Sequence, residues 1–487
     1  MKISVPNRAW SALWISVLLS AAASGARAEV QLNSLFSEGA VLQRGVVVPV
    51  WGTASDGERV TVKFQGQTVS ATARNGRWLV RLKRLKAGGP YTLSVAGQSN
   101  TLVVSNVLVG EVWLCSGQSN MAFMLERAAN AAEAIAGARD SQLRLFSVPR
   151  RATDSPLSDT EGGWQESAPD TAAKFSAVAW FFGRDLRRAL GVPVGLIHSS
   201  VGGTPAEAWT SRAGLERDPA LKAILERHEA SIRNYAPAPA AKRSKKAPRA
   251  AADPRTTQRR PCGLYNGMIA PLQPYAIAGA IWYQGEANAG RAAEYQKLFP
   301  AMIEDWRRAW GQGRFPFLFV QIAPHQRMMP EIREAQWLTW QKVPRTGMAV
   351  TTDVGNETDI HPTQKEPVGA RLALAARVVA YGEPITFSGP VYKGMSIKDG
   401  DAILSFKHIG RGLLAKGGEL KGFTIAGADG NFVPATARIE GEKVVVSSPA
   451  VAKPAAVRYG WANTPDVNLF NREGLPATPF RTDAEAK

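Results

Sequence analysis

Ser119 is the residue whose position most strongly suggests chemistry. An apolar run from Val107 to Cys115 ends abruptly in Ser116-Gly117-Gln118-Ser119-Asn120, and a stretch rich in Ala, Met, Leu and Glu follows. A buried strand that breaks into a glycine turn and then opens a helix places one side chain at the carboxyl edge of a sheet. A serine there can act as a nucleophile beside backbone N–H donors. The alternative is that Ser119 only caps the helix, which serine often does.

Polar or glycine-rich segments also follow two later apolar runs. The sequence GGTPAEAW (202–209) follows 194–199, and Gly285-Glu286-Ala287-Asn288 follows 278–284, which Gln284 closes. Paired glycines let a backbone N–H approach a ligand, and a fixed amide side chain can donate toward developing negative charge. A plain turn at Gly202 and Gly203, and helix capping by Asn288, are the competing interpretations.

A serine nucleophile needs a base that is neutral near pH 7, for which histidine is the natural choice. Of five histidines, His361 has the best position, because it lies in DVGNETDIHP (353–362) directly after an apolar run and before a helical stretch. Asp359 precedes His361 by two positions. His325, which follows another strand, is the one rival of His361 as a base, or is a substrate contact. Metal and nucleotide sites lack support, because the chain has no HExxH pair and no GxxxxGK[ST] or GxGxxG motif after a strand.

The elements that must position these residues alternate between apolar strands and amphipathic helices from about 106 to 380. This alternation predicts a three-layer α/β fold with a parallel sheet whose carboxyl edge carries the site. Helical spacing of apolar residues predicts helices at about 177–190, 291–310 and 365–380. The sequence predicts five buried parallel strands, namely 108–115, 194–199, 278–284, 317–322 and 348–353.

Both flanks of this region indicate β structure. In 29–105, Val60, Val62 and Phe64 alternate with polar residues, and Asn75-Gly76 predicts a tight turn within a small sandwich. In 385–487 alternating segments are punctuated by glycine. This second β-rich segment either forms its own domain or packs with the first.

The first 28 residues have the pattern of a secretory signal peptide. Lys2 and Arg8 precede an apolar run, Ala9 to Ala23, which is too short to span a bilayer, and Ala26-Arg27-Ala28 offers a cleavage site. We therefore expect an exported mature chain with no integral membrane segment, in the periplasm or outside the cell.

The net charge of +18 does not indicate nucleic-acid binding. Residues 236–261 hold eight Lys or Arg against one Asp among Pro and Ala, so this segment is expected to be a flexible basic insertion. Cys115 and Cys262 form no disulfide framework, although a bridge between them is possible.

Five motifs taken together resemble the sialate O-acetylesterase family of SGNH-type carbohydrate esterases. They are GQSNM (117–121), GGTPAEAW (202–209), LYNGMIAPL (264–272), WYQGEAN (282–288) and DIHP (359–362). The resemblance implies a three-layer catalytic domain at 106–384 that acts on acetyl esters of carbohydrates without a cofactor. It implies Ser119 as nucleophile and His361 as base, with the Ser119 N–H, an N–H of Gly202 or Gly203, and the Asn288 side chain, or Gln284 instead, as oxyanion donors.

The third member of a triad is less defined. The SGNH pattern places the acid three residues before the histidine, where this chain has Thr358, so Asp359, Asp353 or a main-chain carbonyl remain candidates. Possible substrate contacts are Gln118, Gln284, Glu286, Glu207 and Trp209. Sialic acids and acetylated plant polysaccharides such as xylan or xyloglucan stay open as substrates. The rival functions are a non-catalytic carbohydrate-binding protein on the same fold and a hydrolase of another ester, although the GxSxG elbow of lipases is absent.

Overall fold

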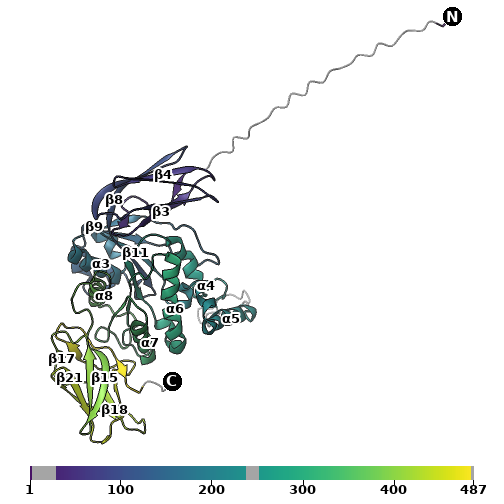
Figure 1. Ribbon diagram of the computed structural model, residues 1–487. Coiled ribbons are helices and arrows are strands. Elements are labelled where there is room, and N and C mark those ends of the chain that lie inside the picture. The colour runs from purple at the N-terminus through teal and green to yellow at the C-terminus, as the bar shows by residue number, and fades with distance from the viewer. Residues whose placement is uncertain (3–28, 237–251, 484–487) are drawn as a thin grey trace.

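The computed structural model describes residues 29–236 and 252–483 together with Met1 and Lys2. The rest of the expected signal peptide and residues 237–251 of the basic insertion lie outside the described residues. Three parts follow one another along the chain: an N-terminal β part, a central α/β domain and a C-terminal β part (Figure 1).

The N-terminal part consists of two sheets. One has the order β1-β3-β6, and the other is formed by β5, β4, β7 and the first half of β8. Asn75 and Gly76 both have positive φ, 51° and 71°, so the turn expected there has the backbone that Asn-Gly favours. The strands are β1 (Gln31–Leu32), β2 (Val41–Gln43), β3 (Val48–Thr53), β4 (Arg59–Phe64), β5 (Gln67–Thr72), β6 (Arg77–Leu82), β7 (Gly88–Ala96) and β8 (Thr101–Gly117).

Strand β8 connects this part to the central domain. Its first half pairs antiparallel with β7, and its second half lies between β11 and β12, parallel to both. One continuous backbone therefore joins the N-terminal sheet to the centre of the catalytic sheet.

The central sheet has the order β10-β9-β11-β8-β12-β13-β14. A strand is present near each of the five expected ranges, although β14 shares only two residues with the expected 348–353. The parallel part has six strands, because β9 also runs parallel to β11. Arg144 interrupts the apolar pattern of β9, and its buried guanidinium bonds to Ser141 and Asn106, so this strand has no continuous apolar run. The strands are β9 (Asp140–Ser147), β10 (Trp164–Ser167), β11 (Val194–Ser200), β12 (Gly279–Tyr283), β13 (Phe317–Val320) and β14 (Thr346–Ala349).

Helices cover both faces of this sheet (Figure 1). Helices α3 and α8 pack together on one face, and α6 and α7 pack together on the other. The three expected helices are confirmed within one residue at each end. The α-helices are α1 (Ala131–Ala136), α2 (Pro169–Ala173), α3 (Ala177–Leu190), α4 (Arg212–Arg217), α5 (Pro219–Arg233), α6 (Ala292–Trp310), α7 (Pro330–Lys342) and α8 (Glu366–Val379).

Short helical turns complete the domain and lie mostly in the loops after the strands. They are η1 (Leu125–Arg127), η2 (Ala206–Trp209), η3 (Tyr265–Ile269), η4 (Ala270–Leu272) and η5 (Glu286–Arg291). The helix expected directly after Ser119 is absent from this described segment. Residues 118–122 form a turn, and η1 follows with only three residues. Helix propensity in this stretch is overridden by contacts to other loops.

The C-terminal part has its own apolar core of strand residues that is separate from the main core. It lies at the opposite end of the central domain from the N-terminal part, so the two β-rich segments do not pack on each other (Figure 1). Its strands are β15 (Val391–Lys398), β16 (Asp401–Lys407), β17 (Leu413–Ala415), β18 (Phe423–Ala426), β19 (Val433–Pro434), β20 (Thr436–Glu440), β21 (Lys443–Ser447), β22 (Ala456–Tyr459), β23 (Leu469–Asn471) and β24 (Phe480–Arg481).

Cys115 and Cys262 are both buried free thiols, so the possible bridge between them does not form. The described residues contain no helix long and apolar enough to cross a membrane.

The contact between α3 and α8 depends on Gly369. A Cβ atom on Gly369 would lie 2.6 Å from the Cβ of Phe181 and 2.9 Å from the Val178 carbonyl oxygen. We expect Gly369→Ala to lower the free energy of unfolding by about 1–3 kcal/mol through overpacking. Urea unfolding measures this loss. Gly163→Ala, where nothing lies within 4 Å of the added Cβ, is the control and should unfold like the original chain.

Candidate active site

The ends of β8, β11 and β12 are in register, which brings their loops together. Gly117 at the end of β8 lies opposite Ser200 of β11 and Tyr283 of β12. The loops after these strands carry Ser119, the pair Gly202 and Gly203, and Asn288. The chain crosses from one side of β8 to the other between β11 and β12, which is where ligands bind in open α/β sheets.

Ser119 lies on a tight turn that begins at Gly117. Gly117 has φ +140°, and a Cβ there would lie 2.2 Å from the Tyr283 carbonyl oxygen, so a side chain would push β8 and β12 apart. The Gln118 N–H donates to the same carbonyl at 2.9 Å, and the Gln118 carbonyl accepts from Met121 and Ala122. This turn leaves Ser119 half-buried while its neighbours on both sides are buried.

Unpaired backbone donors lie on this serine and on the glycine pair after β11. Within the described residues, the N–H groups of Ser119, Gly202 and Gly203 donate no hydrogen bond, and both glycines are exposed. A Cβ on Gly202 would lie 3.4 Å from the Cβ of Ser119, so the glycine backbone is next to the serine. Free N–H groups on a serine and on a glycine next to it are donors that could stabilise an oxyanion.

The Asn288 side chain is held by hydrogen bonds to the loops after β11 and β12. Its Oδ1 accepts from the Ala206 N–H at 2.9 Å and from Gln284 Nε2 at 2.7 Å, and its Nδ2 donates to Glu207 at 2.9 Å. These bonds fix which end of the amide is nitrogen and leave one N–H of Nδ2 for another acceptor.

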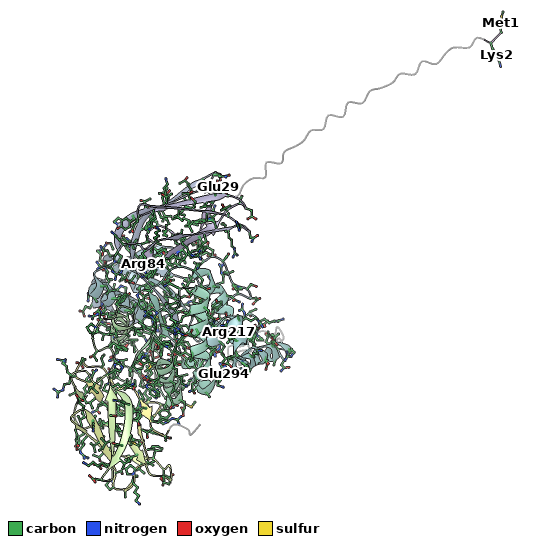
Figure 2. The ribbon with its side chains drawn as sticks, viewed as in Figure 1. Met1, Lys2, Glu29, Arg84, Arg217 and Glu294 are labelled. Atoms are coloured by element: carbon green, nitrogen blue, oxygen red, sulfur yellow. The ribbon has the colours of Figure 1, made fainter. Side chains whose placement is uncertain are left out.

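Glu207 and Trp209 do not have the roles expected from the sequence. Glu207 is buried, and besides Asn288 it accepts from Arg291 Nη2 at 2.6 Å, so it supports Asn288 rather than facing a sugar. Arg291 also pairs with Glu294 on α6, a residue labelled in Figure 2. Trp209 is fully buried, and its indole N–H donates to Thr204, so it is a core residue.

Gln118, Gln284 and Glu286 likewise point into the loop framework. Gln118 Oε1 accepts from the Ala287 N–H at 3.3 Å. Gln284 is fully buried and donates to the Thr204 carbonyl as well as to Asn288. Glu286 Oε1 accepts from Asn120. The three side chains therefore connect the β8 and β12 loops, and none of these contacts places them in a substrate-binding position.

Asn120 joins the serine loop to the histidine loop. Its Nδ2 donates to the Ile360 carbonyl at 3.0 Å and to Glu286 at 2.6 Å. The bond to Ile360 links the residue after Ser119 to the residue before His361. The Ser119 hydroxyl and the His361 ring are not hydrogen-bonded within the described residues, and catalytic hydrogen bonds often tighten only when substrate binds.

Asp359 is the acid near His361. Its Oδ1 accepts the His361 backbone N–H at 2.8 Å and lies 3.7 Å from the ring nitrogen Nδ1, which is ion-pair distance rather than a hydrogen bond. Asp353, the alternative, is engaged elsewhere, because both of its oxygens accept from Arg371 at 2.7 and 2.6 Å. Asp359 is therefore the carboxylate available to this histidine.

Burial lowers the pKa of His361 below its usual 6.5. Asp359 opposes this shift, whereas the positive charges of Lys365, Arg127 and His325 add to it. His325 is buried, and its Nδ1 accepts from the Arg327 N–H, while the next residue, Gln326, donates its N–H to Glu357 in the histidine loop. A lowered pKa keeps His361 neutral and able to accept a proton at pH 7.

Three supporting residues were not identified from the sequence: Asn120, Lys365 and Arg291. Lys365 is buried and donates to Asn120 Oδ1. A lysine or arginine in a helical stretch normally indicates a solvated face, so no sequence signal marks these two. Asn120 stands inside the GQSNM motif, which was the available signal.

The chain matches known carbohydrate esterases. Residues 256–378 match the family described as "Carbohydrate esterase, sialic acid-specific acetylesterase". The sialate O-acetylesterase of Rattus norvegicus is 31% identical, covering 96% of this chain and 97% of the rat protein, and that of Homo sapiens is 34% identical, covering 70% and 69%. A crystal structure of a carbohydrate acetylesterase from Xanthomonas citri is 43% identical, with a TM-score of 0.84, covering 94% of this chain and all of the other. Together with the serine and histidine loops, these similarities show that the chain belongs to the sialate O-acetylesterase family and is a carbohydrate esterase.

Proposed function

We propose that Ser119 and His361 hydrolyse O-acetyl esters of carbohydrates through an acetyl-serine intermediate. The observation that carries this proposal is the set of free donors on Ser119 and on the two neighbouring loops, namely the N–H groups of Ser119, Gly202 and Gly203 and the remaining N–H of Asn288. These donors suit the oxyanion of a tetrahedral intermediate.

In the proposed mechanism His361 takes the Ser119 proton as Oγ attacks the acetyl carbonyl carbon. The carbonyl oxygen becomes an oxyanion held by the donors. The bond to the sugar oxygen then breaks, and His361 returns the proton to that oxygen. Water, deprotonated by His361, attacks the acetyl-serine and releases acetate and the free Ser119 hydroxyl. Asp359 orients and stabilises the imidazolium formed in each half of the reaction.

An acidic sugar is the substrate that the surroundings favour. Arg259 is exposed and donates to the Gly203 carbonyl at 2.8 Å, which places a guanidinium beside the glycine turn. A guanidinium binds carboxylates well, and the rat and human relatives are named for sialate esters. We therefore propose that O-acetylated sialic acid is a better substrate than the neutral polysaccharides xylan and xyloglucan.

We also propose that the protein is exported. The support is the pattern of Lys2, Arg8 and the apolar run Ala9 to Ala23, which lies mostly outside the described residues.

Ser119→Ala should reduce acetate release to background on every substrate, because no other hydroxyl replaces the nucleophile. The assay compares acetylated sialic acid with acetylated xylan and xyloglucan, and Ser70→Ala, a change on the exposed N-terminal sheet, serves as control. A fluorophosphonate probe should label the original chain and not the Ser119 variant. Substantial activity in Ser119→Ala would remove Ser119 from the mechanism, and saccharide binding without turnover by the original chain would favour the non-catalytic alternative.

Glu207→Ala should lower kcat with little change in KM, because the variant frees Asn288 without removing it. Loss of one oxyanion donor costs about 10²–10³ in kcat, so Asn288→Ala should fall in that range and Glu207→Ala should be milder. Initial rates on the best substrate test this order, with Glu226→Ala on the exposed face of α5 as the control. A large increase in KM with unchanged kcat would instead assign Glu207 to substrate binding.

A further inference from the structure

Lys365 is a buried cation next to the proposed catalytic loops. It precedes α8, four residues after His361, and its side chain is 1% exposed. Lysine is almost never buried to this extent without a specific partner. Its ammonium donates to Asn120 Oδ1, and it lies 4.8 Å from the ring centroid of Phe123 and 5.4 Å from that of Tyr283.

Lys365 and two hydrogen-bond acceptors together fix how the Asn120 amide is oriented. An ammonium group only donates hydrogen bonds, so the oxygen of the amide must face Lys365. The NH₂ end is then directed at the Ile360 carbonyl and Glu286. Reversing the amide would place NH₂ against the ammonium and oxygen against two acceptors.

This amide is the direct link between the segments that carry Ser119 and His361. Asn120 follows the serine and Ile360 precedes the histidine, although 240 positions separate the two bonded residues. A bond that fixes the direction of the amide therefore also fixes the spacing between nucleophile and base.

Lys365 also acts on His361 through its charge. Burial lowers the pKa of Lys365 to about 7, while Glu286 and Asp359 oppose that shift. Below that pH the protonated lysine lowers the pKa of His361, together with Arg127 on η1 and His325 after β13, against the opposite effect of Asp359. Burial raises the pKa of Glu286, and Asn120 and Lys365 oppose this.

We propose that Lys365 is a positioning residue of this esterase: it holds the Asn120 amide in place, and that amide holds Ser119 and His361 at the correct spacing. The inference rests on the proposed function of Ser119 and His361. It adds a buried cation, outside the serine–histidine–carboxylate set, on which turnover depends.

Three variants separate the two effects of Lys365. Lys365→Met removes both the donor and the charge, Lys365→Gln keeps a donor and removes the charge, and Asn120→Ala removes the link and keeps the charge. The measurement is kcat and KM for the best acetylated substrate from pH 4.5 to 8.5, with circular dichroism and thermal unfolding to verify folding.

Lys365→Met should lower kcat tenfold or more at pH 7 with KM changed less than threefold. The acid limb of its pH profile, where kcat/KM falls as the pH is lowered, should also move to higher pH. The reason is that His361 without the nearby cation holds its proton more tightly. Lys365→Gln should show the shifted limb with a smaller loss of kcat. Asn120→Ala should lose kcat with the limb in its original place, and combining it with Lys365→Met should cost little more kcat than either change alone.

The proposal is overturned if a folded Lys365→Met or Lys365→Gln keeps both the original kcat and the original acid limb. Should both lysine variants fail to fold, an Asn120→Ala enzyme with the original kcat overturns it. An equal loss of kcat at all pH values without a moved limb in Lys365→Gln would overturn the role of the charge. Failure of the proposed function is distinguishable, because it would appear as activity remaining in Ser119→Ala.

Discussion

The hydrogen bond from the Asn120 amide to the Ile360 carbonyl is the contact on which the site depends. The serine loop follows the central strand of the sheet, whereas the histidine loop follows β14 at the end of the same sheet. Parallel strands alone place both loops at one edge but do not set the distance between them. A short amide with defined donors and acceptor, bonded on three sides, supplies that constraint.

The site is assembled from two polar clusters, each with buried and half-buried members, rather than from apolar packing. One contains Asn120, Glu286 and Lys365, and the other contains Asn288, Glu207, Gln284 and Arg291. Buried polar groups are expensive unless their hydrogen bonds are made, and directional bonds specify a geometry that apolar contacts cannot. This arrangement is consistent with a site whose donors must be in place before charge develops on the substrate.

The two β-rich parts support the site from opposite ends of the domain. The N-terminal part is continuous with β8, and thereby with the strand that ends before Ser119. The C-terminal part contacts the loop of His325, because the Asn463 carbonyl accepts from the His325 N–H and its Nδ2 donates to Gln326. The Gln326 N–H in turn donates to Glu357 in the histidine loop. The C-terminal part is therefore connected to His361 through a short series of loop contacts.

The sequence by itself determined the elements and the main candidates for chemistry. Apolar runs and helical spacing predicted five of the six parallel strands and α3, α6 and α8, because secondary structure reflects the pattern of near neighbours. Ser119, Asn288 and His361 followed from their types and from their places after strands. Residue type and place along the chain are local properties, so the sequence alone could suggest these candidates.

The tertiary structure decided which polar side chains face one another. Glu207 and Glu286 accept hydrogen bonds from Asn288 and Asn120. Trp209 lies in the core, and Asp353 pairs with Arg371. Lys365 is buried and bonded to Asn120. A turn stands where a helix was expected after Ser119. Strand β9 contains the buried Arg144, which bonds to Asn106. The partner of a polar side chain depends on the register and packing of segments hundreds of residues apart, and no local pattern contains that information.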